Sequence, residues 1–187
     1  MEENLNENSN RESQEIKRTV TMKGRPMILQ GEEINIGSPA PDFKVIANDM
    51  LPMKFKRTYS GKTVLISSVP SLDTPVCDLE TRKFNSEAEK LSPEIEIVTI
   101  SMDLPFAQSR WCGAAGVKRV KTYSDYMKAE FGKAYGVLIK DLRLLARAIF
   151  IADKNSVIRY VQIVPEVTQE PNYEEALKAL KEIAQEN

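Results

Sequence analysis

Two cysteines and the absence of histidine limit the chemistry that this sequence can perform. Cys77 and Cys112 are the 2 cysteines among 187 residues, and the histidine count is 0. Without imidazole, the chain has no Ser–His–Asp triad, no Cys–His dyad and no histidine metal ligand. Two cysteines are also too few for an all-cysteine zinc site, so we expect no metal. Nucleophilic or acid–base chemistry must therefore come from thiol, carboxylate, hydroxyl, Lys, Arg or Tyr groups.

The spacing of the cysteines leaves their role open. Cys77 and Cys112 form neither a C-x-x-C motif nor the disulfide framework of a small secreted domain. Free cysteine is among the most buried residue types, so two thiols that merely pack in the core are the simplest interpretation. The residues before Cys77 favour a reactive thiol instead.

Cys77 lies in the first turn of a predicted helix that directly follows a buried strand. The apolar run within residues 62–68 predicts the strand, and a helix is expected over residues 75–91. Thr74 is a good N-cap, and Pro75 is typical of a first helical position. Unpaired backbone N–H groups and the helix dipole at this end favour a thiolate, at the edge of the sheet where such folds bind ligands. On position alone, a reactive and a merely packed thiol are equally good interpretations.

The elements around this turn alternate between strands and helices. Strands are predicted at residues 43–47, 62–68, 95–101 and 121–123, helices at 75–91, 105–112, 126–135 and 172–185, and hairpins within 19–29 and 147–164. Such alternation implies crossover connections and a central sheet with helices on both faces, and the closing hairpin makes the sheet mixed. We therefore expect an α/β three-layer sandwich with an N-terminal β-hairpin.

Composition favours one domain and excludes some partners. Residues 19–187 contain no internal repeat or linker, so we expect a single domain. Residues 1–18 form a polar leader that is too poor in apolar residues to fold, and it lacks the features of a secretory or mitochondrial signal. The 26 basic and 27 acidic residues give a net charge of −1, which argues against binding to nucleic acid or an anionic membrane surface. The apolar runs are too short to span a membrane.

Three separated segments carry recognisable motifs. Residues 70–77 read PSLDTPVC and are followed by RKFN at 82–85, residues 103–113 read DLPFAQSRWCG, and residues 144–148 read LLARA. In this order they resemble the peroxidatic, resolving-cysteine and active-site arginine segments of the peroxiredoxins, in the thiol peroxidase branch with two cysteines of the atypical type. The resemblance extends from about residue 19 to the C-terminus.

The resemblance implies a fold, an activity and partners. We expect a thioredoxin-like sandwich and a thioredoxin-dependent peroxidase that reduces hydrogen peroxide and organic hydroperoxides. Cys77 is the expected peroxidatic nucleophile that becomes a sulfenic acid, and Cys112 is the expected resolving thiol that closes an intramolecular disulfide with it. No cofactor is expected. The resemblance further suggests a homodimer, and we expect a cytoplasmic protein.

The chemistry of peroxide reduction suggests roles for three further residues. Negative charge develops on one peroxide oxygen as the thiolate attacks the other, and Arg147 can stabilise both the thiolate and that oxygen. The hydroxyl of Thr74 can bond to the sulfur and the peroxide, and Pro70 can shield the sulfur from bulk water. The alternatives are an ordinary strand-end salt bridge for Arg147 and a plain N-cap for Thr74.

The predicted disulfide requires movement. Cys112 lies on a different predicted helix from Cys77, whereas disulfide-bonded Cα atoms lie within roughly 7 Å. We therefore expect local unwinding of the first turn around Cys77 and of the 105–112 helix. Two residues depart from the resembled branch: Trp111 replaces a common Phe and Ala115 a frequent acidic residue, and both could affect how this helix unfolds.

Two other functions are compatible with a reactive cysteine on this fold. One is a peroxide-sensing protein that relays oxidation to a partner, and the other is a redox-inert thioredoxin-like module. The presence of both Cys77 and Cys112 favours the enzyme over the sensor, because an internal resolving thiol closes the cycle within one chain. The set Thr74, Cys77 and Arg147 disfavours the inert module.

Overall fold

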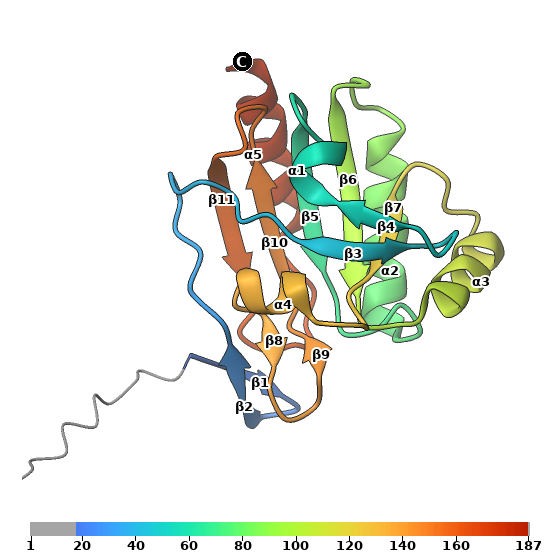
Figure 1. Cartoon of the computed structure of the whole chain (residues 1–187), viewed down its shortest axis with the longest axis vertical. Coiled ribbons are helices and arrows are strands. Elements are labelled where there is room, and N and C mark those ends of the chain that lie inside the picture. Colours follow the sequence, from blue (N-terminus) through green and yellow to red (C-terminus); the bar gives the residue numbers. More distant parts are fainter. Residues whose placement is uncertain (1–17, 187) are drawn as a thin grey trace, which may run out of the picture.

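The computed structural model describes residues 18–186, which form two β-sheets and five helices (Figure 1). The strands are β1 (Thr19–Met22), β2 (Arg25–Gln30), β3 (Lys44–Ala47), β4 (Pro52–Lys54), β5 (Thr63–Ser68), β6 (Ile95–Ser101), β7 (Lys121–Ser124), β8 (Leu138–Ile139), β9 (Leu144–Leu145), β10 (Ala148–Ala152) and β11 (Ile158–Ile163). The helices are α1 (Phe55–Thr58), α2 (Pro75–Ala88), α3 (Pro105–Ala115), α4 (Glu130–Ala134) and α5 (Tyr173–Gln185).

The larger sheet is mixed, as the sequence predicts. Its seven strands run in the order β11-β10-β5-β6-β7-β3-β4. The three central strands β5, β6 and β7 are parallel, because the connections through α2 and α3 are crossovers. The outer strands pair antiparallel, including the predicted β10–β11 hairpin. This arrangement brings the end of β5, where the active-site turn begins, next to the start of β10.

Helices cover both faces of this sheet, which confirms the predicted layers (Figure 1). Successive side chains of a strand point to opposite faces. In β5, Val64 and Ile66 therefore pack into one core with residues of α1 and α4, and Leu65 packs into the other with residues of α2, α3 and α5. The second core contains Cys77, so the helix that bears this thiol is anchored directly on the sheet.

Three helices differ in extent from the prediction by more than one residue. The helix predicted over residues 75–91 ends at Ala88. The helix predicted to end before Gly113 continues as α3 to Ala115 and stops at Gly116, whose φ of 67° is left-handed. Glycine adopts that conformation without steric cost, so Gly116 and not Gly113 is the C-terminal signal. The helix predicted over residues 126–135 is reduced to α4, because Ala129 has a positive φ of 52° and interrupts the helical backbone.

The short elements β4, α1, β8 and β9 were not predicted. Strands β8 and β9 contain two residues each, too few to show a periodicity. They extend the confirmed β1–β2 hairpin into a second sheet of order β1-β2-β8-β9. Strand β9 ends two residues before Arg147. The second sheet therefore helps to fix the position of the Arg147 backbone.

The predicted flexible leader lies, apart from Arg18, outside the described residues. The Arg18 guanidinium donates hydrogen bonds to the carbonyl oxygens of Gly31 and Gly136, each at 3.0 Å. Arg18, which the sequence assigns to the leader, is therefore hydrogen-bonded to the folded domain. Between residues 18 and 186, no helix is both long and apolar enough to cross a membrane.

Candidate active site

The turn between β5 and α2 brings the first predicted site residues together. Pro75 occupies the first helical position and Thr74 is the N-cap residue, so Cys77 lies in the first turn of α2. The turn is tied to the end of β6 by Asp103, whose carboxylate accepts hydrogen bonds from the Ser71 hydroxyl at 2.7 Å and a backbone N–H at 2.8 Å. The helix start that holds the thiol is thus fixed to two parallel strands.

The Thr74 hydroxyl contacts the sulfur and does not cap the helix. Its oxygen lies 2.7 Å from the Cys77 sulfur and 2.9 Å from the carbonyl oxygen of Ser71, and it makes no capping bond to the helix backbone. One hydroxyl carries one hydrogen, so it donates to one of these acceptors at a time. A thiolate is the stronger acceptor because it is charged. The hydroxyl can therefore donate to the sulfur when Cys77 is ionised and to Ser71 when Cys77 is a thiol.

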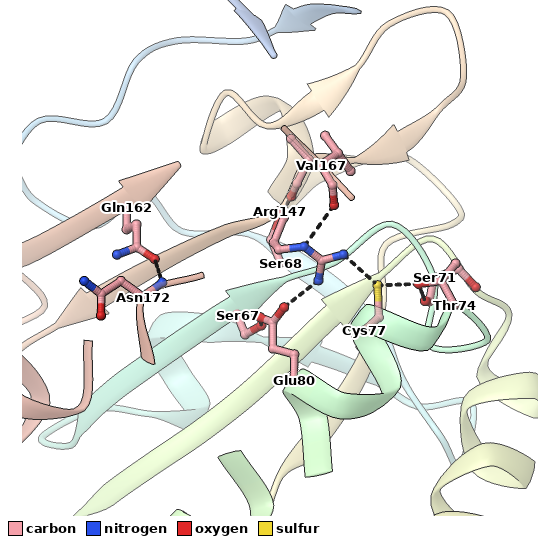
Figure 2. A network of polar contacts seen from close by, with 11 residues as sticks. Ser67, Ser68, Ser71, Thr74, Cys77, Glu80, Arg147, Gln162, Val167 and Asn172 are labelled. Atoms are coloured by element: carbon pink, nitrogen blue, oxygen red, sulfur yellow. Dashed lines mark hydrogen bonds and ion pairs between the residues drawn. The ribbon is translucent and has the colours of Figure 1, made fainter. Parts of the chain in front are cut away.

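Arg147 reaches the same sulfur from the start of β10 (Figure 2). Its Nη2 lies 3.4 Å from the Cys77 sulfur, and its Nε donates to the carbonyl oxygen of Val167 at 3.0 Å. The residue is 1% exposed. Burial lowers the pKa of Arg147, but the adjacent charges of Cys77 and Glu80 raise it by more. The guanidinium is therefore a permanent positive charge beside the sulfur.

Cys77 itself is completely buried. Pro70 is also buried, at the start of the loop that leads to Cys77. A buried thiol between a hydroxyl and a guanidinium has two donors aimed at the position of its negative charge. Hydrogen bonds to the charged form, together with a nearby opposite charge, favour that form. The two donors can therefore stabilise negative charge at the position of the buried sulfur.

Glu80 is a site residue that the sequence analysis missed. It lies one turn after Cys77 on α2 and is fully buried, with Oε2 at 2.5 Å from Nη1 of Arg147 and Oε1 at 2.7 Å from the hydroxyl of Ser67. Burial raises the pKa of the Glu80 carboxyl, and attraction to Arg147 opposes that rise. We assign the ionised form at neutral pH, because the contact is that of a charge-assisted pair. An acidic residue three positions after the cysteine, on the same helix face, was the available signal.

We expect Glu80→Gln to slow the peroxide attack that the family resemblance implies by about tenfold, because the amide holds the Arg147 guanidinium less firmly. A tenfold change corresponds to about 1.4 kcal/mol. Weakening a buried pair should also lower the free energy of unfolding by about 2 kcal/mol, below the cost of deleting a partner. Peroxide consumption under single-turnover conditions and urea unfolding measure the two effects. Glu87→Gln, at a half-buried position near the C-terminal end of the same helix, is the control. Wild-type values for both quantities would contradict the positioning role of Glu80.

Cys112 lies apart from this cluster. It is on α3, half-buried, with its sulfur 3.3 Å from the hydroxyl of Thr122 on β7. It also lines a cavity of about 300 Å³ together with Asn48 and Lys121. Both cysteines are free thiols. The structure therefore brings Cys77 together with its predicted neighbours but leaves Cys112 outside this cluster, at β7 on the same face of the sheet.

No metal site accompanies the cluster. Within the part of the chain that the structure describes, no group of three or more cysteine, aspartate or glutamate side chains could hold a metal ion. The polar groups around the sulfur are instead donors to an anion. They can stabilise a thiolate and, equally, a negative charge that develops on an oxygen next to it.

Comparisons of the sequence with known proteins point to one family. A family model described as Redoxin matches residues 35–177. The thiol peroxidase of Halalkalibacterium halodurans is 52% identical over 163 residues, which cover 87% of this chain and 97% of that protein. The thiol peroxidase of Bacillus subtilis is 49% identical over 162 residues, or 87% of this chain and 96% of that protein.

Solved structures resemble this fold over most of its length. A peroxiredoxin-like protein from Aquifex aeolicus superposes with a TM-score of 0.82 at 41% identity, covering 89% of this chain and 97% of that one. A thiol peroxidase from Chromobacterium violaceum gives a TM-score of 0.79 at 21% identity, covering 90% and 98%. These likenesses confirm the thioredoxin-like character of the predicted sandwich.

Proposed function

This chain belongs to the thiol peroxidase branch of the peroxiredoxins, within the redoxin family, and from that membership we propose a residue-level mechanism. The chain is a peroxidase that reduces peroxides with electrons from a thiol reductant. The sensor alternative is not favoured. Cys77 is the peroxidatic nucleophile, and one observation carries this assignment: its buried sulfur lies 2.7 Å from the Thr74 hydroxyl and 3.4 Å from the Arg147 guanidinium.

The first step transfers one oxygen to sulfur. The Cys77 thiolate attacks the terminal oxygen of the hydroperoxide, the S–O bond forms as the O–O bond breaks, and the leaving alkoxide or hydroxide takes up a proton. Arg147 and Thr74 donate to the sulfur before the attack and to the peroxide oxygens during it. Cys77 is left as a sulfenic acid. Pro70, which is buried beside the turn, limits access of bulk water to the sulfur.

The second step forms the disulfide. The Cys112 thiol attacks the sulfenic sulfur, and the S–S bond forms as water leaves. A dithiol reductant then restores both thiols and is itself oxidised to a disulfide. We propose thioredoxin as that reductant. The two free thiols fit a reducing compartment, and we propose the cytoplasm.

A homodimer is part of the proposal. Leu104 and Phe106, at the start of α3, are 51% and 68% exposed. Large apolar side chains exposed next to one another are typical of interaction surfaces. A second copy of the chain packed against α3 would cover them.

The proposed function is tested by steady-state peroxide consumption. With thioredoxin, thioredoxin reductase and NADPH, the protein should oxidise NADPH in proportion to the hydrogen peroxide added, over many turnovers. If the rate stays at background with thioredoxin but rises with a small dithiol, thioredoxin is refuted as the reductant. The catalytic cycle itself would stand. Failure with both reductants, by a protein whose cysteines are reduced at the start, would refute the catalytic cycle.

Cys112→Ser is expected to stop the cycle after one turnover. The variant should still consume one equivalent of peroxide per chain, because the groups around Cys77 are unchanged. It should then accumulate the sulfenic acid, and excess peroxide should convert this to sulfinic acid, which thiols do not reduce. Mass spectrometry after thiol blocking measures the oxygen added in the variant and the loss of two hydrogens in the wild type. A variant that keeps turning over with thioredoxin would show that Cys112 is only a packed thiol.

A further inference from the structure

The Arg147 guanidinium is held by two contacts besides the one with the sulfur. Glu80 binds Nη1, and the backbone carbonyl oxygen of Val167 accepts a hydrogen bond from Nε at 3.0 Å (Figure 2). Because the guanidinium is planar, two fixed contacts define the plane in which the third nitrogen, Nη2, can donate. Nη2 lies 3.4 Å from the Cys77 sulfur. The position of the Val167 carbonyl therefore helps to decide where Arg147 donates.

Val167 lies in the turn after β11 and is attached to the N-terminal hairpin. Its N–H donates to the carbonyl oxygen of Thr21 on β1 at 2.8 Å, and the Thr21 N–H donates to the carbonyl oxygen of Pro165 at 2.7 Å. The Val167 side chain is buried in the same core as Val20 and Leu29, which belong to β1 and β2. The peptide group that accepts from Arg147 is thus placed by the hairpin.

Glu166 joins this turn to the tip of the hairpin. Its carboxylate accepts hydrogen bonds from the backbone N–H groups of Lys23 and Gly24, at 2.9 and 3.0 Å, and from the Thr21 hydroxyl at 2.9 Å. It also accepts from the N–H and the hydroxyl of Thr168, at 3.1 and 2.6 Å. These bonds, that of the Thr168 hydroxyl first, lower the pKa of the Glu166 carboxyl. An ionised carboxylate only accepts hydrogen bonds, and so it suits a ring of donors.

The hairpin tip exposes N–H groups that Glu166 can bind. Lys23 and Gly24 form a two-residue loop between paired strands, and both have a positive φ, of 52° and 75°. That conformation is typical of a type I′ turn, which matches the twist of the flanking strands. The two central N–H groups of such a turn have no partner within the hairpin. Glu166 supplies their partner and thereby fixes the tip against the turn after β11.

We propose that Glu166 is a positioning residue for the reduction of peroxide: it fixes the β1–β2 hairpin to the turn after β11, and so fixes the Val167 carbonyl that orients the Arg147 guanidinium. This inference rests on the proposed function. In the described part of the chain, the Glu166 carboxylate makes its hydrogen bonds to the hairpin and to Thr168, and none to Arg147 or Cys77. It can therefore act on the site only through the backbone beside it.

Two variants weaken these contacts and leave every side chain around the sulfur in place. Glu166→Gln keeps the shape, but its NH₂ group must face either the two donors at Oε2 or the three at Oε1, so at least two hydrogen bonds are lost. Thr21→Val removes one hydroxyl donor and keeps the backbone pairing of β1.

Asp153→Asn is the matched control. The Asp153 carboxylate also accepts backbone N–H groups of a turn, those of Asn155 and Val157 at 2.9 and 3.0 Å. This turn joins β10 to β11 at the end of β10 opposite to Arg147. The control therefore makes the same chemical change at a carboxylate of the same kind, far along the strand from the guanidinium.

The rate of peroxide attack is measured with Cys112→Ser in the background, so that loss of one equivalent of hydrogen peroxide reports the first step alone. Glu166→Gln should slow the attack by about tenfold, less than the roughly 10²-fold that a misplacement of about 1 Å can cost. Thr21→Val, which removes one hydrogen bond, should slow it by about threefold. Asp153→Asn should keep the rate of the parent chain.

The decisive comparison repeats Glu166→Gln in a chain that also carries Arg147→Ala. If Glu166 acts through the guanidinium, its substitution has nothing left to misplace, and the double variant should react as slowly as Arg147→Ala alone. Independent effects would instead multiply. A tenfold loss that persists without Arg147 would refute the inference, because it would then come from general loosening of the fold.

The outcomes separate this inference from the proposed function. A parent chain that consumes no peroxide, or an Arg147→Ala chain that reacts at the parent rate, would refute the proposed mechanism. A slow Arg147→Ala chain, together with parent rates in folded Glu166→Gln and Thr21→Val, would refute the role of Glu166 alone. An equal slowing in Asp153→Asn would also refute it. If circular dichroism shows that Glu166→Gln does not fold, Thr21→Val decides the question by the same comparison with and without Arg147.

Discussion

Cys77→Ser is expected to reduce peroxide consumption to the background rate. A serine hydroxyl stays protonated at neutral pH even between the Thr74 hydroxyl and the Arg147 guanidinium, and it is a far weaker nucleophile than a thiolate. Serine has nearly the volume of cysteine, so the buried site should stay folded. Loss of peroxide can be measured directly, and NADPH oxidation can be followed in the coupled assay with thioredoxin and its reductase.

Cys112→Ser is the matched control for this result. It makes the same chemical change at a thiol outside the cluster and should retain the first equivalent of peroxide consumption. Steady turnover above background in Cys77→Ser would remove Cys77 from the central role. Such turnover would leave Cys112 as the one remaining thiol able to attack a peroxide.

Arg147→Ala is expected to slow peroxide attack by about 10²- to 10³-fold, the range for removing one preorganised donor to a developing charge. The variant removes the positive charge beside the sulfur and a donor to the peroxide oxygens. Loss of one equivalent of peroxide, measured with Cys112→Ser in the background, reports the rate of the attack alone. An unchanged rate of peroxide attack would contradict the role of Arg147.

The same substitution has a structural cost that its controls must separate from catalysis. Without Arg147, the buried Glu80 carboxyl loses its partner, and removal of one member of a buried pair costs about 3–5 kcal/mol. Burial already raises the pKa of Glu80, so the carboxyl can take up a proton and limit this cost. Arg147→Lys keeps the charge but loses the planar geometry, and should recover part of the rate. Arg159→Ala breaks ion pairs on the neighbouring strand, with Asp153 at 3.3 Å, and should leave the rate unchanged.

Most of the fold could be predicted because its longer elements have clear periodicities. Strand β10 is apolar over all five residues, β5 contains the apolar run VLI, β6 has four apolar residues among seven, and α5 has apolar residues at helical spacing. The two-residue strands β8 and β9 could not be predicted. Their pairing depends on contact with β2, which is more than a hundred residues away in the sequence. For the same reason, the second sheet became visible only in the structure.

The contacts of the candidate site are also of two kinds: some follow from local backbone geometry, and others depend on strand pairing. Thr74 and Cys77 are three residues apart, so the geometry of one helix start determines their contact. The LLARA motif singled out Arg147, but its distance from Cys77 depends on the pairing of β10 with β5. The catalytic roles of Thr74, Cys77, Arg147 and Pro70, and the resolving role of Cys112, stay predictions until the variants are measured.

The sequence by itself determined the chemistry that is available and the local frame that carries it. It has no histidine, two cysteines and one strand–turn–helix segment that places Cys77 at a helix start. Only the tertiary structure decided which distant groups meet the sulfur, that Glu80 pairs with Arg147, and that Cys112 is held against another strand. The physical reason is that contacts within one turn follow from backbone geometry, whereas contacts between residues far apart in the chain depend on strand order and on side-chain packing between layers.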